Sequence, residues 1–267
     1  MGERAGTSLK QKPAKGPFDV IVIGSGIGGL ATAAILAKRR GKRVLVLERH
    51  YVAGGFTHVF TRPGYEWDVG IHYIGGVGSK KSPVRRLFDE ITDGKLEWAP
   101  QDDTYDRIFL GEREYDFVTG PEAFRKKLHS YFPKEKKAID DYLAAVKSTV
   151  WWGQTYFAEK LLPGSPWARP LGAVLRAPFL RFAGKTTREV VSKFTKNEEL
   201  IAVLTGQYGD YGLPPSQSSF GVHAFVVDHY LHGGFYPVGG ASRIAVHAAD
   251  IIERAGGRVA VNAEVQE

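Results

Sequence analysis

A glycine-rich turn between an apolar strand and an alanine-rich helix constrains the fold of this chain most strongly. The sequence FDVIVIG at residues 18–24 is typical of a buried strand, because most of its apolar residues are β-branched. GGLATAAILAKRR at 28–40 is typical of a helix whose small side chains let it approach a sheet closely. KRVLVLE at 42–48 adds a second buried strand. This order predicts two parallel strands joined by a helix.

The same segment also has the length of a membrane-spanning helix, because residues 20–37 carry no charged side chain. Its middle is interrupted by four glycines, Gly24, Gly26, Gly28 and Gly29. Its first half is β-branched, whereas its second half is rich in alanine. A strand, a tight turn and a helix account for this composition, so we expect no membrane span here.

Composition limits the classes of function. Hydrophobic residues make up 43% of the chain and charged residues 24%, which permits a globular core. The net charge of +7 favours anionic partners such as nucleotide phosphates or acidic lipids. The basic residues form no single stripe, so we expect no nucleic-acid partner. The chain has no cysteine, which excludes disulfides and thiolate sites and is compatible with a cytoplasmic location.

The turn contains the pattern G-x-G-x-x-G at Gly24, Gly26 and Gly29. With 32 glycines in 267 residues, the pattern alone has little specificity. Its setting raises the specificity, because it follows a strand, opens a helix and precedes a second strand that ends in Glu48. Together these features match the fingerprint of a dinucleotide site, in which the start of the helix faces a diphosphate. A glycine-rich turn without a ligand is the structural alternative.

Each residue of this fingerprint has a physical role. Gly24 permits the tight turn, Gly26 lets the backbone approach a diphosphate, and Gly29 allows close packing of helix and strand. Glu48 can accept hydrogen bonds from a ribose hydroxyl. The same carboxylate repels a 2′-phosphate, so NADP is the least expected nucleotide.

Three segments taken together resemble one family of proteins. They are VIVIGSGIGGLATAAILAKRRGKRVLVLERHYVAGG (20–55), YEWDVGIHYIGG (65–76) and YPVGGASRIAVHAADIIERAGGRVAVNAEV (236–265). The chain resembles the FAD-dependent amine-oxidase-like superfamily and, more narrowly, its phytoene desaturase, carotenoid isomerase and retinol saturase group. The phrase DVGIHYIGG is most similar to the retinol saturase branch. The resemblance implies FAD as the cofactor.

The resemblance also implies roles for residues around the cofactor. Glu48 and Arg49 would lie near the adenosine ribose, and Gly54 and Gly55 near the diphosphate and ribityl chain. The last strand would give the adenine a backbone contact at Val265.

The segment 65–76 raises the question of what His72 does. Three glycines near it, Gly70, Gly75 and Gly76, are expected where the backbone passes close to the flavin. Asp68 is interpreted as an acceptor for nearby backbone N–H groups. His72 is then either a proton donor beside the flavin or a positioning residue, and it is the one catalytic candidate.

The resemblance implies a Rossmann-like, FAD-binding α/β fold with a parallel sheet and an inserted α+β substrate domain. We expect a flexible basic tail at 1–16, the first part of the FAD-binding domain at 17–78, the substrate domain at 79–234 and a returning segment at 235–267. The local patterns add a hairpin of YDRIFL (105–110) and REYDFV (113–118). They also add helices at about 134–160, 187–195 and 241–257, and a strand from 258.

The middle of the chain holds two ambiguous features. Four aromatic residues either line a hydrocarbon tunnel or belong to the core: Trp151, Trp152, Tyr156 and Phe157. The apolar segment 171–184 carries only arginines as charges, which is compatible with a peripheral membrane contact. The preferred interpretation is a core helix kinked at Pro178 or the wall of an apolar pocket.

The resemblance implies an FAD-dependent saturase, desaturase or isomerase acting on a hydrophobic polyene such as a carotenoid or retinoid. The alternatives are an amine-oxidase-like enzyme with a polar substrate and a non-catalytic protein similar to Rab escort proteins. We expect no metal site, although His223, His229 and His232 lie close in sequence. Members of the family are about twice as long as this chain. The chain is therefore expected to be truncated, with a complementing C-terminal half or partner chain, and to bind FAD weakly by itself.

Overall fold

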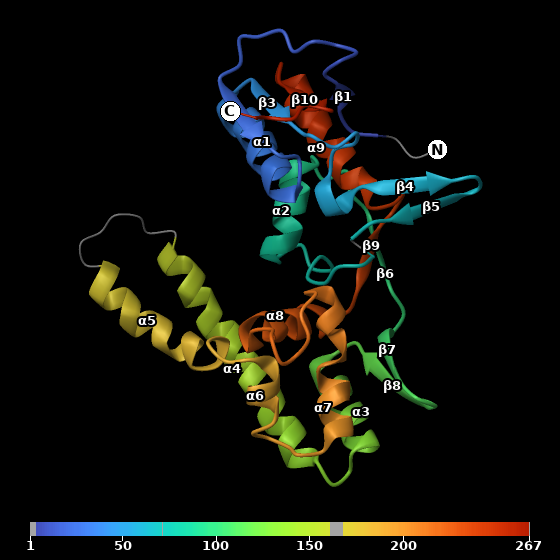
Figure 1. The fold of residues 1–267 in the computed structure, drawn as a ribbon, viewed down its shortest axis with the longest axis vertical. Helices are drawn as coiled ribbons and strands as arrows, with labels where there is room; N and C mark the ends of the chain where they lie inside the picture. Colours follow the sequence, from blue (N-terminus) through green and yellow to red (C-terminus); the bar gives the residue numbers. More distant parts are fainter. Residues whose placement is uncertain (1–3, 71, 161–167, 267) are drawn as a thin grey trace. The chain divides into compact units, whose positions relative to one another are not determined.

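The structure of the protein, a computed structural model, describes residues 4–70, 72–160 and 168–266 (Figure 1). The chain divides into two compact units, which we call unit 1 (residues 1–101 and 234–267) and unit 2 (residues 102–233). Unit 1 is therefore assembled from two segments of the chain, and unit 2 is inserted between them in sequence.

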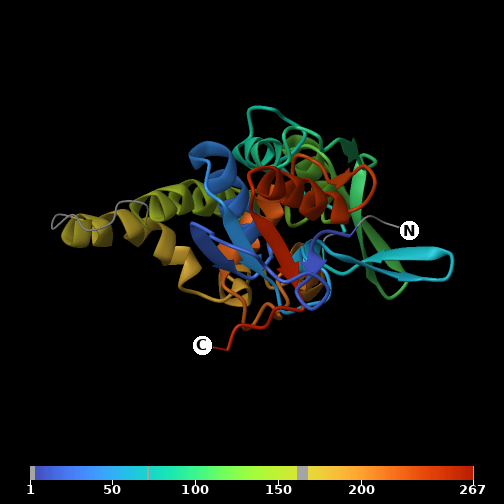
Figure 2. The ribbon, with the colours of Figure 1, turned by 90° about the horizontal axis from the view of Figure 1, so that it is seen from above.

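Unit 1 contains a parallel sheet, whose strands within the described residues follow the order β1-β10-β3-β2. The strands are β1 (Thr7–Ser8), β2 (Val20–Ile23), β3 (Val44–Leu47) and β10 (Arg258–Val261). Every pairing in this sheet is parallel (Figure 2). Ile21 lies beside Leu45, and Val259 lies beside Val46. The predicted pair of parallel strands joined by a helix is confirmed.

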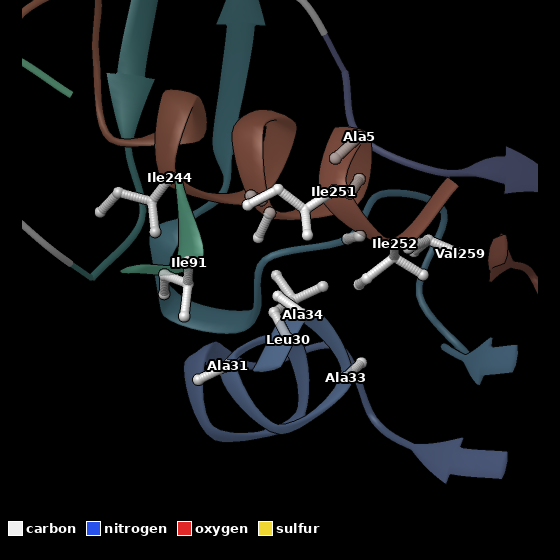
Figure 3. Close-up of a cluster of buried hydrophobic side chains, with 14 of the residues drawn as sticks. Ala5, Leu30, Ala31, Ala33, Ala34, Ile91, Ile244, Ile251, Ile252 and Val259 are labelled. Carbon is white, nitrogen blue, oxygen red and sulfur yellow. The ribbon is translucent and has the colours of Figure 1, made fainter. Parts of the chain in front are cut away.

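Helices of unit 1 cover one face of this sheet. They are α1 (Ile27–Arg40), α2 (Pro83–Ile91) and α9 (Ser242–Arg254). Their common core includes Leu30, Ile252 and Val259, all fully buried (Figure 3). The alanines of α1 favour a helix and leave room for α9 to pack closely. α1 ends where Gly41 adopts a φ of 59° and its N–H donates to the carbonyl of Leu36.

Residues 4–16 do not form the flexible tail that the polar composition predicted. β1 pairs with β10, and Leu9 and Phe18 pack on the second face of the sheet against Leu45 and Ala260. The guanidinium of Arg258 donates hydrogen bonds to three backbone carbonyls, those of Ser8, Lys12 and Pro13. The segment is therefore fixed by a strand 250 residues later in the chain.

Two antiparallel pairs complete unit 1. β4 (Val59–Arg62) and β5 (Tyr65–Asp68) form a hairpin, preceded by the short 3₁₀ helix η1 (Gly55–Thr57). β6 (Trp98–Pro100) pairs with β9 (Phe235–Pro237). The first division between the units thus falls after Gln101 and not at the expected limit of 78. The reason is that α2 packs on α1 and α9, while β6 pairs with the returning strand β9.

Unit 2 combines a hairpin with helices. The hairpin consists of β7 (Thr104–Leu110) and β8 (Arg113–Val118), as predicted. The helical elements are α3 (Pro121–Tyr131), α4 (Lys136–Lys160), α5 (Ala168–Ala183), α6 (Thr187–Val191), α7 (Glu198–Leu204), η2 (Gly206–Asp210) and α8 (Phe220–Tyr230). The long helix expected at 134–160 is confirmed as α4, whereas α6 ends at Val191, before the predicted Thr195.

α5 continues past Pro178 and packs on α4 and α8 within unit 2 (Figure 1). Within the described residues, no helix combines the length and the apolar composition needed to cross a bilayer. The uncharged segment 20–37 consists of β2, the glycine turn and most of α1.

Candidate dinucleotide site

The glycine turn is built by backbone geometry that side chains would prevent. Gly24 has a φ of +92° and donates its N–H to the carbonyl of Leu47 at 2.8 Å, which ties the turn to β3. A Cβ placed on Gly29 would lie 2.1 Å from the carbonyl oxygen of Gly24. Gly29 is therefore required by the protein itself, because the first turn of α1 packs directly on the end of β2.

Gly26 and Gly28 are not explained by the packing of the protein. Gly26 has a φ of −60° and a ψ of 170°, values that any residue can adopt. A Cβ added to Gly26 or to Gly28 would meet no atom within 4 Å. The surface of the turn is thus open and free of side chains at the start of α1, where backbone N–H groups favour an anion.

Ser25 occupies a variable position of the glycine pattern, and it links the glycine turn to Glu48 and to Gly54. Its side chain is fully buried. Its N–H and its hydroxyl both donate to Oε2 of Glu48, at 2.9 and 2.7 Å. Ser25 also accepts a hydrogen bond from the N–H of Gly54 at 3.2 Å, through its hydroxyl and its carbonyl. The sequence signal for this role is a small hydroxyl residue inside the glycine pattern.

Glu48 keeps a site for a ligand hydroxyl. Its Oε1 accepts a hydrogen bond from the His50 N–H at 2.8 Å, and a carboxylate oxygen has two lone-pair directions. Partial burial by itself raises the pKa of this carboxyl. The hydrogen bonds from His50 and Ser25 outweigh burial, so the pKa of Glu48 lies below its ordinary value. Glu48 is therefore an anion at neutral pH.

The second glycine pair lies against the first turn. Gly54 and Gly55 have φ values of +126° and +57°, a region that favours glycine. A Cβ on Gly55 would lie 2.9 Å from the Cα of Gly26. The structure thus brings these two glycine segments, which α1 and β3 separate in the chain, into backbone contact.

An open cavity of about 260 Å³ lies beside Glu48 and is bordered by Arg49 and Val265, two further residues of the predicted cofactor site. Its lining includes Gly24, Glu48, Arg49 and Val265. The backbone of 262–265 reaches this place because the Ala263 N–H donates to the Glu48 carbonyl at 2.8 Å. Val265 is 39% exposed and Arg49 is exposed, so both border the opening.

The structure gives protein contacts to two of the residues expected near the flavin, Asp68 and Gly70. Asp68 accepts a hydrogen bond from the hydroxyl of Tyr236 on β9 at 2.6 Å, so a side chain from a distant segment donates to it. Burial and this carboxylate raise the pKa of Tyr236 to about 12. A Cβ on Gly70 would lie 2.7 Å from Phe56, so packing within unit 1 explains that glycine. The side chain of His72 is exposed.

Of the four aromatic residues expected to line a tunnel or to belong to the core, two are exposed and two are half-buried. Trp151 and Phe157 on α4 are 65% and 54% exposed, and Trp152 and Tyr156 are half-buried. Among the described residues, no three His, Asp or Glu side chains gather in a metal-binding arrangement. His223 instead lies between two tyrosines, with Nε2 2.8 Å from the Tyr142 hydroxyl and Nδ1 3.1 Å from the Tyr211 hydroxyl.

Known proteins are similar to this chain in part of its sequence and in its fold. Residues 22–91, which contain the glycine turn, α1 and Glu48, match the model of the NAD(P)-binding Rossmann-like domain. Among solved structures, cyclohexylamine oxidase from Brevibacterium oxydans is similar, with 21% identity, a TM-score of 0.60, and coverage of 91% of this chain and 51% of that one. Rab GDI from Plasmodium falciparum has 16% identity, a TM-score of 0.52, and coverage of 94% and 59%. At these identities the likeness concerns the fold alone.

Similarity in sequence is higher to curated proteins. All-trans-retinol 13,14-reductase from Homo sapiens is 44% identical over 267 residues, which cover 97% of this chain and 43% of that protein. A protein from Danio rerio named inactive all-trans-retinol 13,14-reductase is 36% identical, with coverage of 93% and 42%. Prolycopene isomerase 1 from an Oncidium hybrid cultivar is 29% identical, with coverage of 93% and 43%.

This chain spans about two-fifths of the length of the curated relatives that it matches. The match to these relatives runs through both units and includes the glycine turn, Glu48 and the returning segment. Over that part of their length, the chain is similar to the all-trans-retinol 13,14-reductases and to the prolycopene isomerases.

Proposed function

We propose that this chain forms the adenosine-diphosphate half of the cofactor site in an FAD-dependent oxidoreductase that acts on a conjugated polyene lipid, such as a retinoid or carotenoid. The observation that carries the proposal is the open surface at Gly26 and Gly28. The protein does not need glycine there, whereas a diphosphate approaching the start of α1 does. Glu48 beside this surface supplies an acceptor for a ribose hydroxyl.

The substrate class rests on sequence identity. The retinol reductase from Homo sapiens is 44% identical to this chain, whereas the amine oxidase structure is 21% identical. Saturation, desaturation and isomerisation of a polyene share one cofactor arrangement, so the proposal covers all three. One relative is named as inactive, so similarity in sequence does not establish turnover, and turnover of this chain must be measured.

The residues of this chain bind and orient the cofactor in this proposal. Backbone N–H groups at the start of α1 hold the diphosphate, and Glu48 accepts a hydrogen bond from the ribose through Oε1. The backbone at Val265 contacts the adenine, and Gly54 and Gly55 let the chain pass beside the diphosphate. When bound, FAD supplies hydride transfer to or from the substrate double bond.

The remainder of the relatives' length is expected to complete the site. We therefore expect the 267-residue chain to bind FAD weakly and to have no turnover of its own. A tightly bound yellow chromophore on the purified chain would contradict this expectation. A chain extended to the length of the relatives should instead purify with FAD bound, as judged by its absorption spectrum.

Substrate depletion distinguishes the proposal from its alternatives. The extended, flavin-loaded chain is incubated with all-trans-retinol, with a carotenoid and with a primary amine, under oxidising and reducing conditions. Loss or shift of the polyene absorption, with the amine unchanged, supports the proposal. Amine consumption favours the amine-oxidase-like alternative. An extended, folded chain that holds no flavin at saturating FAD favours a non-catalytic protein similar to Rab escort proteins.

A further inference from the structure

α5 has a buried side that fits tightly into unit 2. Phe179 is buried, and its ring packs at 4.9 Å from the ring of Tyr156 on α4. A Cβ on Gly221 of α8 would lie 2.7 Å from Ala183. Arg176, on the same side of α5, forms an ion pair with Glu159 at 3.6 Å. This side of the helix is therefore occupied by contacts within unit 2.

The opposite side of α5 is apolar and exposed. Val174 is 69% exposed, Leu180 is 46% exposed and Leu175 is 37% exposed. Ala173 and Ala177 are also exposed, and the exposed positions recur at the spacing of a helix. Among the described side chains of α5, residues 172–183, Arg181 is the charged residue on this side. We call these residues the outer face of α5. A solvent-facing helix normally carries its polar residues there.

Cations border the outer face at the end of α5. Arg181, Lys185 and Lys193 are exposed, and the neighbouring ammonium of Lys185, followed by burial and Arg181, lowers the pKa of Lys193. The carboxylate of Glu189 interacts with Lys185 and Lys193 and also accepts hydrogen bonds from the N–H and hydroxyl of Thr186 in a helix cap. The cluster therefore keeps an excess of positive charge beside an apolar surface.

We infer that the outer face of α5 binds an anionic lipid surface, with the helix lying in the interface and the cations of residues 181–193 against lipid headgroups. Apolar residues would enter the headgroup and acyl boundary, and basic residues would meet negative charge, which is the arrangement of interfacial helices. A second copy of the chain would bring the same cations to this face, whereas an anionic membrane supplies the opposite charge. Arg176, paired with Glu159, takes no part. The inference does not depend on the proposed catalytic function.

Vesicle sedimentation with the 267-residue chain tests this inference. The chain should pellet with vesicles of phosphatidylcholine and phosphatidylglycerol, and much less with pure phosphatidylcholine. Raising the ionic strength from about 0.1 M to about 0.5 M should weaken pelleting, because salt screens exposed charges. The double variant Val174→Glu/Leu180→Glu should lower the partition constant by about tenfold or more. Lys185→Glu/Lys193→Glu should lower it only with anionic vesicles.

A matched control carries the same change of charge elsewhere in unit 2. Phe109 and Leu213 are 63% and 49% exposed and lie outside α5. Phe109→Glu/Leu213→Glu should pellet as the unchanged chain does. Circular dichroism spectra of all variants establish that they are folded.

Because the chain has no cysteine, a single introduced thiol gives a second measurement that does not require charged substitutions. Val174→Cys labelled with a polarity-sensitive fluorophore should shift its emission to the blue on addition of anionic vesicles, and Leu213→Cys should not. Failure of the chain to pellet, or equal pelleting of Val174→Glu/Leu180→Glu without a shift at 174, overturns the inference. Loss of self-association in that variant, without lipid binding by the unchanged chain, assigns the outer face to a second copy instead.

Discussion

The hydroxyl and the N–H of Ser25 both donate to the same oxygen of Glu48, at 2.7 and 2.9 Å. This relationship joins the glycine turn to the end of β3 through a buried side chain. The carboxylate, which lines the open cavity, is thereby held in place, and its Oε1 accepts a hydrogen bond from the His50 N–H. The dinucleotide fingerprint thus includes a serine that organises the acidic residue.

Ser25→Ala removes one donor from Glu48 and leaves the turn glycines unchanged. We expect a loss of about 1–2 kcal/mol in the free energy of unfolding, because a buried hydrogen bond to a charged group is lost. The pKa of Glu48 should also rise toward its ordinary value. Urea unfolding measures the first effect. The control is Thr32→Ala, whose exposed hydroxyl bonds the Gly28 carbonyl; an equal loss in this variant would contradict a special role for Ser25.

Gly26→Ala and Gly29→Ala separate the needs of a ligand from those of the fold. The added Cβ at 26 meets no protein atom, so stability should stay within about 0.5 kcal/mol while nucleotide binding is lost. At 29 the Cβ would overlap the Gly24 carbonyl, so stability should fall by about 2 kcal/mol or more. Thermal unfolding and titration with adenosine 5′-diphosphate measure both quantities. Unchanged nucleotide binding in Gly26→Ala would remove the diphosphate from this place.

Glu48→Gln should change the choice of nucleotide. The neutral amide still offers an oxygen to a ribose hydroxyl, but it no longer repels a 2′-phosphate. Adenosine 2′,5′-bisphosphate should therefore bind the variant better than it binds the unchanged chain, while adenosine 5′-diphosphate binds several-fold more weakly. Calorimetric titrations at low salt compare the two ligands. If the ratio of the two affinities stays the same, Glu48 does not contact the ribose.

The stability of unit 2 should fall in mild acid because of His223. The Tyr142 hydroxyl donates to the Leu204 carbonyl at 3.3 Å and so accepts from Nε2–H of His223. Nδ1 then accepts from the Tyr211 hydroxyl. Burial lowers the pKa of His223 to about 4. Between about pH 6.5 and 4 the unfolded state binds the extra proton, so stability decreases as the pH falls, by up to about 3 kcal/mol.

Urea unfolding at several pH values measures this effect. His223→Gln should flatten the pH dependence in that range, although it also lowers stability at neutral pH. The exposed His72 offers a control, and His72→Gln should leave the profile as it is. A profile that His223→Gln does not flatten would show that other groups take up the proton.

His72→Gln also tests the catalytic candidate in the extended, flavin-loaded chain. The exposure of His72 favours a positioning or structural role, so we expect polyene turnover within about threefold of the unchanged enzyme. A general acid would contribute about 10²–10⁴-fold to the rate. A loss of that size, with an altered pH profile and unchanged FAD absorption, would identify His72 as a proton donor.

The local patterns of the sequence determined the β-α-β unit, the glycine turn, the hairpin of β7 and β8, and the long helix α4. Alternation, helical spacing and backbone requirements of glycine act over a few residues, so they can be read directly. The position of Glu48 could also be predicted from the sequence, because the length of the β-α-β segment places it at the end of β3.

The tertiary structure alone decided which distant groups meet. It placed residues 4–16 on the sheet through Arg258, supplied Tyr236 as the donor to Asp68, and set Gly55 against Gly26. It also turned the apolar side of α5 outward. A hydrogen bond or a packing contact between residues far apart in the chain depends on the closure of the whole unit, and no period or spacing in the sequence encodes that closure.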